Sequence, residues 1–237
     1  MDNKHINCNH KKESWWKSYD DCHCYPAHFK TKYPFQIKSY TDIPGWINDA
    51  EFIYEEMVNN AKDGDYFVEI GVLFGQSTTR MAELIKQSNK KIKFDAIDLF
   101  WMIPMTIEAY KECGHPYQFV EYYNRFKEFT ISPVDICKHP LRDLDLVDFV
   151  NFITCDEIYS HRLYDDNSLN FVWIDGDHGD DVVYNHLKNY WPKLKNGAVI
   201  GGDDIHYEPV LHDVKKFTKE KNIKASFTNN GFTITKG

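Results

Sequence analysis

Residues 66–79 read YFVEIGVLFGQSTT, and this stretch decides the fold. Its first part, residues 66–70, is a short and mostly apolar run, which predicts a buried strand. Apolar residues at helical spacing follow over residues 77–86. Gly71 and Gly75 lie between the two, where a strand must turn sharply into a helix. A strand, a glycine loop and a helix in this order predict the opening unit of a doubly wound α/β sheet.

The alternation of strands and helices continues along the chain. We predict strands at 93–99, 150–154, 170–175 and 198–202, helices at 43–61, 157–164, 181–195 and 208–221, and two last strands at 225–228 and 232–235 joined by Asn229-Asn230-Gly231. Pro44 is expected in the first turn of the first helix, and Asn196-Gly197 at the end of the helix that precedes residue 198. Apolar strands separated by helices indicate a parallel sheet covered on both faces. The prediction is therefore a Rossmann-like doubly wound α/β sheet, mostly parallel, with an antiparallel C-terminal hairpin strand.

The domain organisation follows from where this alternation begins. Residues 1–42 form an irregular N-terminal arm rich in Cys, His and aromatic residues, and residues 43–237 form one α/β domain. Residues 100–148 are too long for a simple crossover and are expected to be helical over 118–129. We interpret this helical insertion as a lid or a substrate wall.

Charge and composition exclude several classes of function. The 237 residues carry a formal net charge of −8, which argues against binding nucleic-acid phosphates through clustered basic residues. No apolar run reaches the roughly 20 residues needed to span a bilayer, and the N-terminus lacks the apolar segment of a signal peptide. We therefore expect a cytoplasmic protein with no membrane partner and mostly reduced cysteines.

The glycine loop differs from a dinucleotide fingerprint, because it has two glycines preceded by Glu69 instead of the G-x-G-x-x-G pattern. An acid there suits a ligand with an ammonium and a sulfonium group, and it would repel a pyrophosphate. Asp98 ends the second strand, where a carboxylate can accept hydrogen bonds from both hydroxyls of a ribose. The alternatives are an ordinary tight turn for the glycines and a solvated loop carboxylate for Asp98.

Acidic residues follow two later strands. Asp175 ends the fourth strand and Asp203-Asp204 ends the fifth, so all three belong to the edge that carries the glycine loop. Carboxylates that meet in one cleft repel one another unless a cation neutralises them, and oxygen ligands point to Mg²⁺, Mn²⁺ or Ca²⁺. The alternative is a set of helix caps and solvated acids, which is how we interpret Asp180 and Asp181.

His178 lies three residues after Asp175 and is the expected general base for an acceptor hydroxyl, because its pKa lies near neutrality. The alternative is a loop histidine bonded to the backbone. His206 is a second candidate.

Taken together, Glu-x-Gly-x-x-x-Gly, the strand-two acid, Ile-Asp-Gly-Asp-His and Gly-Gly-Asp-Asp-Ile resemble class I S-adenosylmethionine-dependent methyltransferases. The sequence is most similar to the metal-dependent sugar O-methyltransferases of macrolide and aminocoumarin biosynthesis, over residues 60–235 and chiefly in blocks 66–79 and 170–206. The resemblance implies a small-molecule acceptor, a sugar or a glycosylated metabolite, methylated on a hydroxyl.

The resemblance also implies roles for individual residues. Those expected to contact the cofactor are Glu69, Gly71 and Gly75 at the methionine part with Ser77 nearby, Asp98 at the ribose, Asp156 at the adenine, and also Phe74 and Asp175. Asp175, Asp203 and Asp204 would hold Mg²⁺ or another divalent cation, and His178 with Asp175 would be the catalytic pair.

Two rival functions use the same residues. A metal-dependent hydrolase on an α/β sheet would use the carboxylates but leave the glycine loop unexplained, and a non-catalytic binding module would leave the acids unexplained. In the arm, Cys8, His10, Cys22, His23, Cys24 and His28 invite a zinc site, although no C-x-x-C pair is present. The aromatic residues of the arm favour packing on the domain or a homodimer contact.

Overall fold

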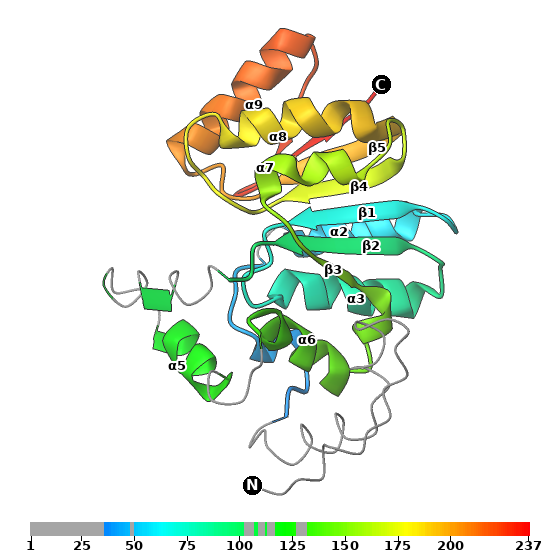
Figure 1. Cartoon of the computed structure of the whole chain (residues 1–237). Helices are drawn as coiled ribbons and strands as arrows, with labels where there is room; N and C mark the ends of the chain where they lie inside the picture. The colour runs from blue at the N-terminus through cyan, green and yellow to red at the C-terminus, as the bar shows by residue number, and fades with distance from the viewer. Residues whose placement is uncertain (1–35, 48–49, 102–106, 109–111, 113–116, 127–131) are drawn as a thin grey trace, which may run out of the picture.

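The computed structural model describes residues 36–47, 50–101, 107–108, 112, 117–126 and 132–237 (Figure 1). Its centre is a seven-stranded sheet in the order β3-β2-β1-β4-β5-β7-β6. The strands are β1 (Tyr66–Ile70), β2 (Lys93–Asp98), β3 (Asn151–Thr154), β4 (Leu169–Ile174), β5 (Leu194–Gly202), β6 (Ser226–Phe227) and β7 (Phe232–Thr235). The first five are parallel, and β7 runs antiparallel to both β5 and β6. The predicted Rossmann-like sheet with an antiparallel C-terminal hairpin is confirmed.

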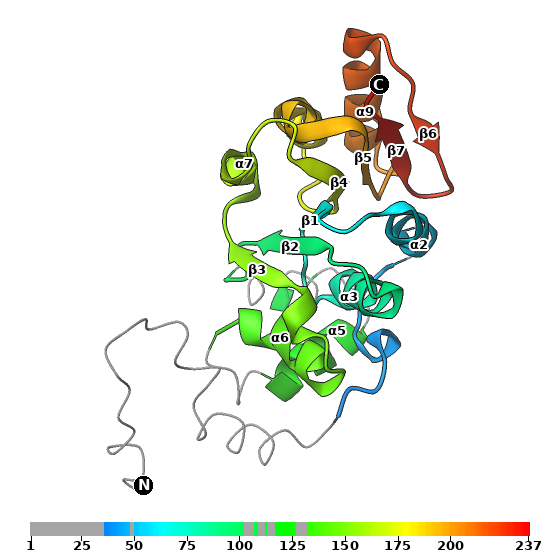
Figure 2. The same ribbon diagram turned by 90° about the vertical axis from the view of Figure 1, so that its right-hand side faces the viewer.

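Helices cover both faces of this sheet, as Figure 2 shows for α2 and α3 on one side and α7 and α8 on the other. The helices are α2 (Ala50–Asn60), α3 (Gln76–Ser88), α5 (Tyr117–Phe126), α6 (Val134–Asp143), α7 (Glu157–Ser160), α8 (Val182–Tyr190) and α9 (Glu208–Lys221). Successive residues of a strand point to opposite faces. In β1, Phe67 therefore packs with α2 and α3, whereas Val68 and Ile70 pack with α8 and α9. Two cores of this kind explain why the strands are almost continuously apolar.

The first predicted helix begins later than expected, so the prediction of a helix from residue 43 is wrong. A 3₁₀ turn, η1 (Tyr40–Asp42), comes first, closed by a capping box of Ser39 and Asp42. Ile43 is extended, and its carbonyl accepts a hydrogen bond of 2.6 Å from Gln76 Nε2. That carbonyl is thus satisfied by a side chain of α3 and not by a helical N–H. Residues 43–47 lie outside any helix, and α2 covers Ala50–Asn60.

The helix predicted over 181–195 is also too long. It ends at Tyr190 and continues as a 3₁₀ turn, η4 (Trp191–Lys193), since Pro192 has no N–H to donate within an α-helix. Strand β5 already begins at Leu194, so Asn196-Gly197 lies inside that strand and not at a helix end. A register shift interrupts the β4–β5 pairing there, and the Gly197 N–H donates to the carbonyl of Lys236.

Strand register brings the carboxyl ends of β1, β4 and β5 to one line. Ile70 pairs with Ile174, and Ile174 pairs with Gly202. The glycine loop, Asp175 and the acids after Gly202 therefore leave the sheet side by side. The chain reverses its strand order between β1 and β4, which is where ligands bind in doubly wound sheets.

The predicted insertion at 100–148 holds the helices α5 and α6 and the 3₁₀ turn η2 (Val147–Phe149) in its described part. Ile107, Phe119, Tyr122, Ile136 and Cys137 pack there into a third apolar cluster with Phe74 of the glycine loop. The insertion thus contacts the loop directly, and its role as a lid stays a prediction. Residues 1–35 of the predicted arm, which include all of its Cys and His residues, lie outside the described residues. No helix in the described ranges is long and apolar enough to cross a membrane.

Candidate active site

The glycine loop between β1 and α3 depends on backbone that only glycine adopts easily. Gly71 has φ +88° and Gly75 has φ +82°, and both lie in the left-handed region. A Cβ on Gly71 would overlap the carbonyl oxygen of Asp175, which shows how closely the loop approaches the end of β4. Gly75 is the N-cap residue of α3, so its left-handed φ sets where that helix begins. The loop is therefore held against the strand end that carries the first acid.

Glu69 lies beneath this loop and is fully buried. Its Oε1 accepts hydrogen bonds from Tyr54 Oη at 3.0 Å and Ser77 Oγ at 2.6 Å, and its Oε2 accepts one from Thr78 Oγ1 at 2.5 Å. Burial raises the pKa of Glu69 to about 7, although the three hydroxyl groups act in the opposite direction. In this arrangement Glu69 and Ser77 bond to each other, and their contact with a cofactor stays a prediction.

Phe74 and Asp98 shape the loop from its other side. The Phe74 ring is fully buried and stacks near Phe119 and Tyr122, with ring centroids 6.0 and 5.2 Å away. Asp98 Oδ2 accepts the N–H groups of Val72 at 2.8 Å and of Leu73 at 3.1 Å. Its Oδ1 accepts the N–H of Phe100 at 2.7 Å. The predicted ribose acid thus fixes the backbone of the loop, and its bond to a ribose stays a prediction.

Asp156 caps the helix that follows β3. Its Oδ1 accepts the N–H of Ile158 at 3.0 Å, as an N-cap residue does. The next residue, Glu157, was not singled out from the sequence. Its Oε1 accepts the N–H of Asp177 at 3.2 Å, and its carboxylate lies over Gly176, where a Cβ would collide with it. Glu157 therefore supports the loop that follows β4.

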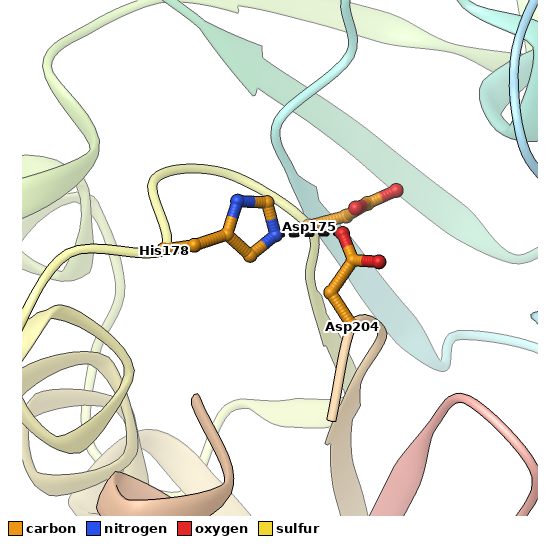
Figure 3. Close-up of side chains that lie close together, drawn as sticks. All are labelled: Asp175, His178 and Asp204. Carbon is orange, nitrogen blue, oxygen red and sulfur yellow. Dashed lines mark ion pairs between the residues drawn. The ribbon is translucent and has the colours of Figure 1, made fainter. Parts of the chain in front are cut away.

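The acids after β4 and β5 meet a histidine (Figure 3). Ligand atoms of Asp175, His178 and Asp204 all lie within 4.8 Å of one another. His178 Nε2 is 2.7 Å from Asp204 Oδ2, and Asp204 itself has a left-handed φ of +65°. Asp203 is buried, and its Oδ1 accepts the N–H of Asp204 at 2.9 Å and Asn230 Nδ2 at 2.6 Å. The structure thus brings two of the three predicted acids together with the predicted base. Asp203 is not a member of this group, and it bonds instead to the backbone of Asp204 and to Asn230.

The pKa values of Asp175, His178 and Asp204 are shifted because acidic side chains lie close together at this site. Burial, with Asp203 and Asp204 next to it, raises the pKa of Asp175 well above its ordinary value. The hydrogen bond to Asp204 raises the pKa of His178. Burial works against the ionised form of Asp204, yet the bond from His178 lowers the pKa of that carboxyl. Two carboxylates at these distances, with an imidazole beside them, fit a divalent cation, since positive charge would relieve the repulsion between the acids.

A family model described as a methyltransferase domain matches residues 68–205. This range is more than half of the chain, and it holds the glycine loop, Asp98 and both acidic strand ends. The chain belongs to this family. The match supports S-adenosylmethionine as the cofactor of this methyltransferase domain. A search of curated proteins gave no significant match.

Solved structures similar to this methyltransferase domain come from several organisms. A SAM-dependent O-methyltransferase from Thermotoga maritima has 14% identity and a TM-score of 0.51, with 82% of this chain and 66% of that one covered. A protein from Staphylococcus aureus assigned as a caffeoyl-CoA O-methyltransferase has 14% identity and a TM-score of 0.55, with 82% and 87% covered. A protein from Clostridium thermocellum assigned as an rRNA methylase has 14% identity and a TM-score of 0.54, with 82% and 100% covered.

The chain thus spans just under two thirds of the length of the Thermotoga protein. At such low identities these likenesses show the fold alone, and residues of the methyltransferase domain must be judged from its own geometry.

Proposed function

We propose that this methyltransferase domain transfers the methyl group of S-adenosylmethionine to a hydroxyl of a small molecule, with a divalent cation at the site. The observation that carries the proposal is the convergence of Asp175, His178 and Asp204 within 4.8 Å at the end of β4 and β5. Gly71 packs against the carbonyl of Asp175, so this group directly adjoins the glycine loop. A methyl donor in the loop and an acceptor over the acids would therefore be neighbours.

The chemistry of the bound groups is simple. S-adenosylmethionine, when bound, supplies an electrophilic methyl group, and a divalent cation supplies positive charge that favours an ionised acceptor hydroxyl. Asp175 and Asp204 would hold the cation, and Asp203 would support them from behind.

His178 is the proposed general base. Its Nε2 lies 2.7 Å from Asp204 Oδ2 and donates to that carboxylate, so the proton of the acceptor would be taken at Nδ1, and the imidazolium formed would stay bonded to an ionised carboxylate. The bond to Asp204 raises the pKa of His178, which strengthens it as a proton acceptor. The remaining contribution of the protein is to orient the hydroxyl in line with the methyl group and to exclude water.

The acceptor is proposed to be a sugar or a glycosylated metabolite. Two observations favour a neutral, hydroxyl-rich molecule over a nucleic acid. The formal net charge is −8, and the site itself consists of carboxylates, which would repel a phosphate backbone. A diol or a hydroxyl with a neighbouring oxygen suits a cation held by carboxylates.

The test begins with isothermal titration of S-adenosylmethionine and S-adenosylhomocysteine, with and without Mg²⁺, followed by transfer of a labelled methyl group to a panel of sugars and glycosides. We expect micromolar binding of the cofactor and turnover that stops when EDTA is added. Asp204→Asn should lose turnover and retain cofactor binding, whereas Asp165→Asn, on the exposed loop before β4 and so at the opposite end of that strand from Asp175, should behave as wild type. Absence of cofactor binding by folded protein would refute the proposal, and EDTA-resistant turnover would refute its cation.

A further inference from the structure

Asn230 joins the C-terminal hairpin to the acidic loop after β5. It lies in the turn between β6 and β7, and its Nδ2 is 2.6 Å from Asp203 Oδ1 and 3.4 Å from Asp204 Oδ1. Its Oδ1 is 2.5 Å from His206 Nδ1. One amide thus contacts two neighbouring acids on one side and a histidine on the other.

The direction of this amide follows from the chemistry of its partners. An ionised carboxylate can only accept hydrogen bonds, so the end of the amide that faces Asp203 and Asp204 must be the NH₂ group. The carbonyl end then faces His206 and can only accept, which requires that His206 carry a proton on Nδ1. Reversing the amide would place oxygen against carboxylate oxygen. The contacts therefore specify a single orientation of Asn230.

The backbone of the hairpin holds Asn230 at this place. The Asn230 carbonyl accepts the N–H of Ile205 at 2.9 Å, which ties the turn to the acidic loop. Within the turn, the Thr228 N–H donates to the carbonyl of Gly231, and the Gly231 N–H donates to Thr228 Oγ1. Directly after the turn, Phe232 pairs with Gly202, the last residue of β5. The amide is therefore carried by a rigid element and is not a loose surface side chain.

Asp203 and Asp204 need such a donor. Two adjacent acids at the end of a strand repel each other, and Asp204 additionally adopts a left-handed backbone that is unfavourable for most residues. An NH₂ group shared between Asp203 Oδ1 and Asp204 Oδ1 fixes both carboxylates without neutralising them. The Oδ2 atom of Asp204 stays directed to His178, the proposed base, and Asp204 lies with Asp175, the other proposed ligand of the cation.

We propose that Asn230 is a positioning residue, which orients Asp203 and Asp204 so that the acidic loop is preformed for a divalent cation. This inference rests on the proposed function, since it concerns the same site. It assigns the antiparallel β6–β7 hairpin a part in that site, beyond extending the sheet. Residues that orient metal ligands from behind are typically worth about 10- to 100-fold in metal affinity.

The experiment measures Mn²⁺ binding to the full chain by isothermal titration and by electron paramagnetic resonance, without any acceptor. We expect Asn230→Ala to weaken Mn²⁺ binding by about 10- to 100-fold. The affinity for S-adenosylhomocysteine should stay within about twofold, because the glycine loop is unchanged. Asn229→Ala is the matched control, as the same substitution at the exposed neighbouring position of the same turn. It should bind Mn²⁺ as wild type does.

Thermal unfolding in EDTA shows whether the variants fold. If Asn230→Ala does not, Asn230→Ser replaces it, since a serine keeps a polar turn but is too short to reach both carboxylates. Equal Mn²⁺ affinity in wild type and in a folded Asn230 variant would overturn the positioning role while leaving the cation site intact. Absence of Mn²⁺ binding by wild type would overturn the cation site itself, and the role of Asn230 with it.

Discussion

Glu69 near the end of β1 and Asp98 at the end of β2 lie at the same edge of the sheet as the acids after β4 and β5, but the oxygens of the two groups face different surroundings. Glu69 and Asp98 each accept three hydrogen bonds, from hydroxyl groups in one case and from backbone N–H groups in the other. Asp175 instead faces Asp203 and Asp204, which raise its pKa together with burial.

The hydrogen-bond partners of each acid therefore indicate whether it supports the loop or is available to bind a ligand. An acid whose oxygens are occupied by protein donors stabilises the fold and shapes the loop around it. Acids that face acids cost stability in the free protein, and a cation or a positively charged ligand removes that cost. Substitution by the neutral amide should therefore have opposite effects on stability at Asp98 and at Asp175.

The largest effect is expected at Asp175. Asp175→Asn should lower turnover roughly 1,000-fold, because the cation loses a ligand next to the reacting hydroxyl. In EDTA the same variant should be more stable than wild type by about 1 kcal/mol, since a half-buried acid facing two others has been replaced by a neutral amide. Thermal unfolding in EDTA and a methyl-transfer assay check the two halves. A variant that is both less stable than wild type and fully active would contradict both roles of Asp175, as a ligand of the cation and as a destabilising acid in the free protein.

The next effect concerns the contact between the two groups of acids. Gly71→Ala should destabilise the fold by about 4 kcal/mol and abolish cofactor binding, because a Cβ would meet the Asp175 carbonyl at a left-handed φ of +88°. Gly64→Ala is the matched control, because Gly64 has a φ of +89° and open space around its Cβ position. It should cost only about 1 kcal/mol. Equal losses in urea unfolding would show that the loop does not pack on β4.

A pH-dependent effect is expected at Glu69. Burial raises its pKa from 4.5 in the unfolded chain to about 7 in the fold, so below pH 4.5 both forms are protonated. As the pH rises toward 7 the unfolded chain ionises first, and the free energy of unfolding falls by up to about 3 kcal/mol. Glu69→Gln cannot ionise and should lose this part of the pH dependence. Urea unfolding at several pH values checks it, and parallel curves for the two proteins would contradict it.

The smallest effect is expected at Asp98. Asp98→Asn keeps one acceptor oxygen but presents an NH₂ group to a backbone N–H, so about 2 kcal/mol of stability should be lost. Calorimetric unfolding measures the loss, and Asp165→Asn on the surface is the control. A gain in stability, as expected for Asp175→Asn, would show that the Asp98 carboxylate also lowers the stability of the free protein.

Much of the fold could be predicted from the sequence, because its signals are local. Strand β1 and helix α9 have the predicted bounds, since period, length and flanking glycines act within a few residues. The helix predicted over 157–164 is α-helical only to Ser160 and continues as a 3₁₀ turn over His161–Leu163. The wrong helix boundaries at residues 43 and 195 arose where a distant group decided the outcome. Gln76 satisfies the carbonyl of Ile43, and the pairing with β4 draws Leu194 into a strand.

The order of residues along the chain was enough to predict which acids lie at strand ends and that Gly71 turns the chain beside them. What each acid faces depends on the packing of elements that are distant in sequence. Tyr54 reaches Glu69 across 15 positions of the chain, and Asn230 reaches Asp203 across 27. Asn230 was recognised only as part of a turn, because its partners are defined by the antiparallel pairing of β5 with β7. A hydrogen bond depends on the positions of two atoms in space, and no local periodicity records that distance.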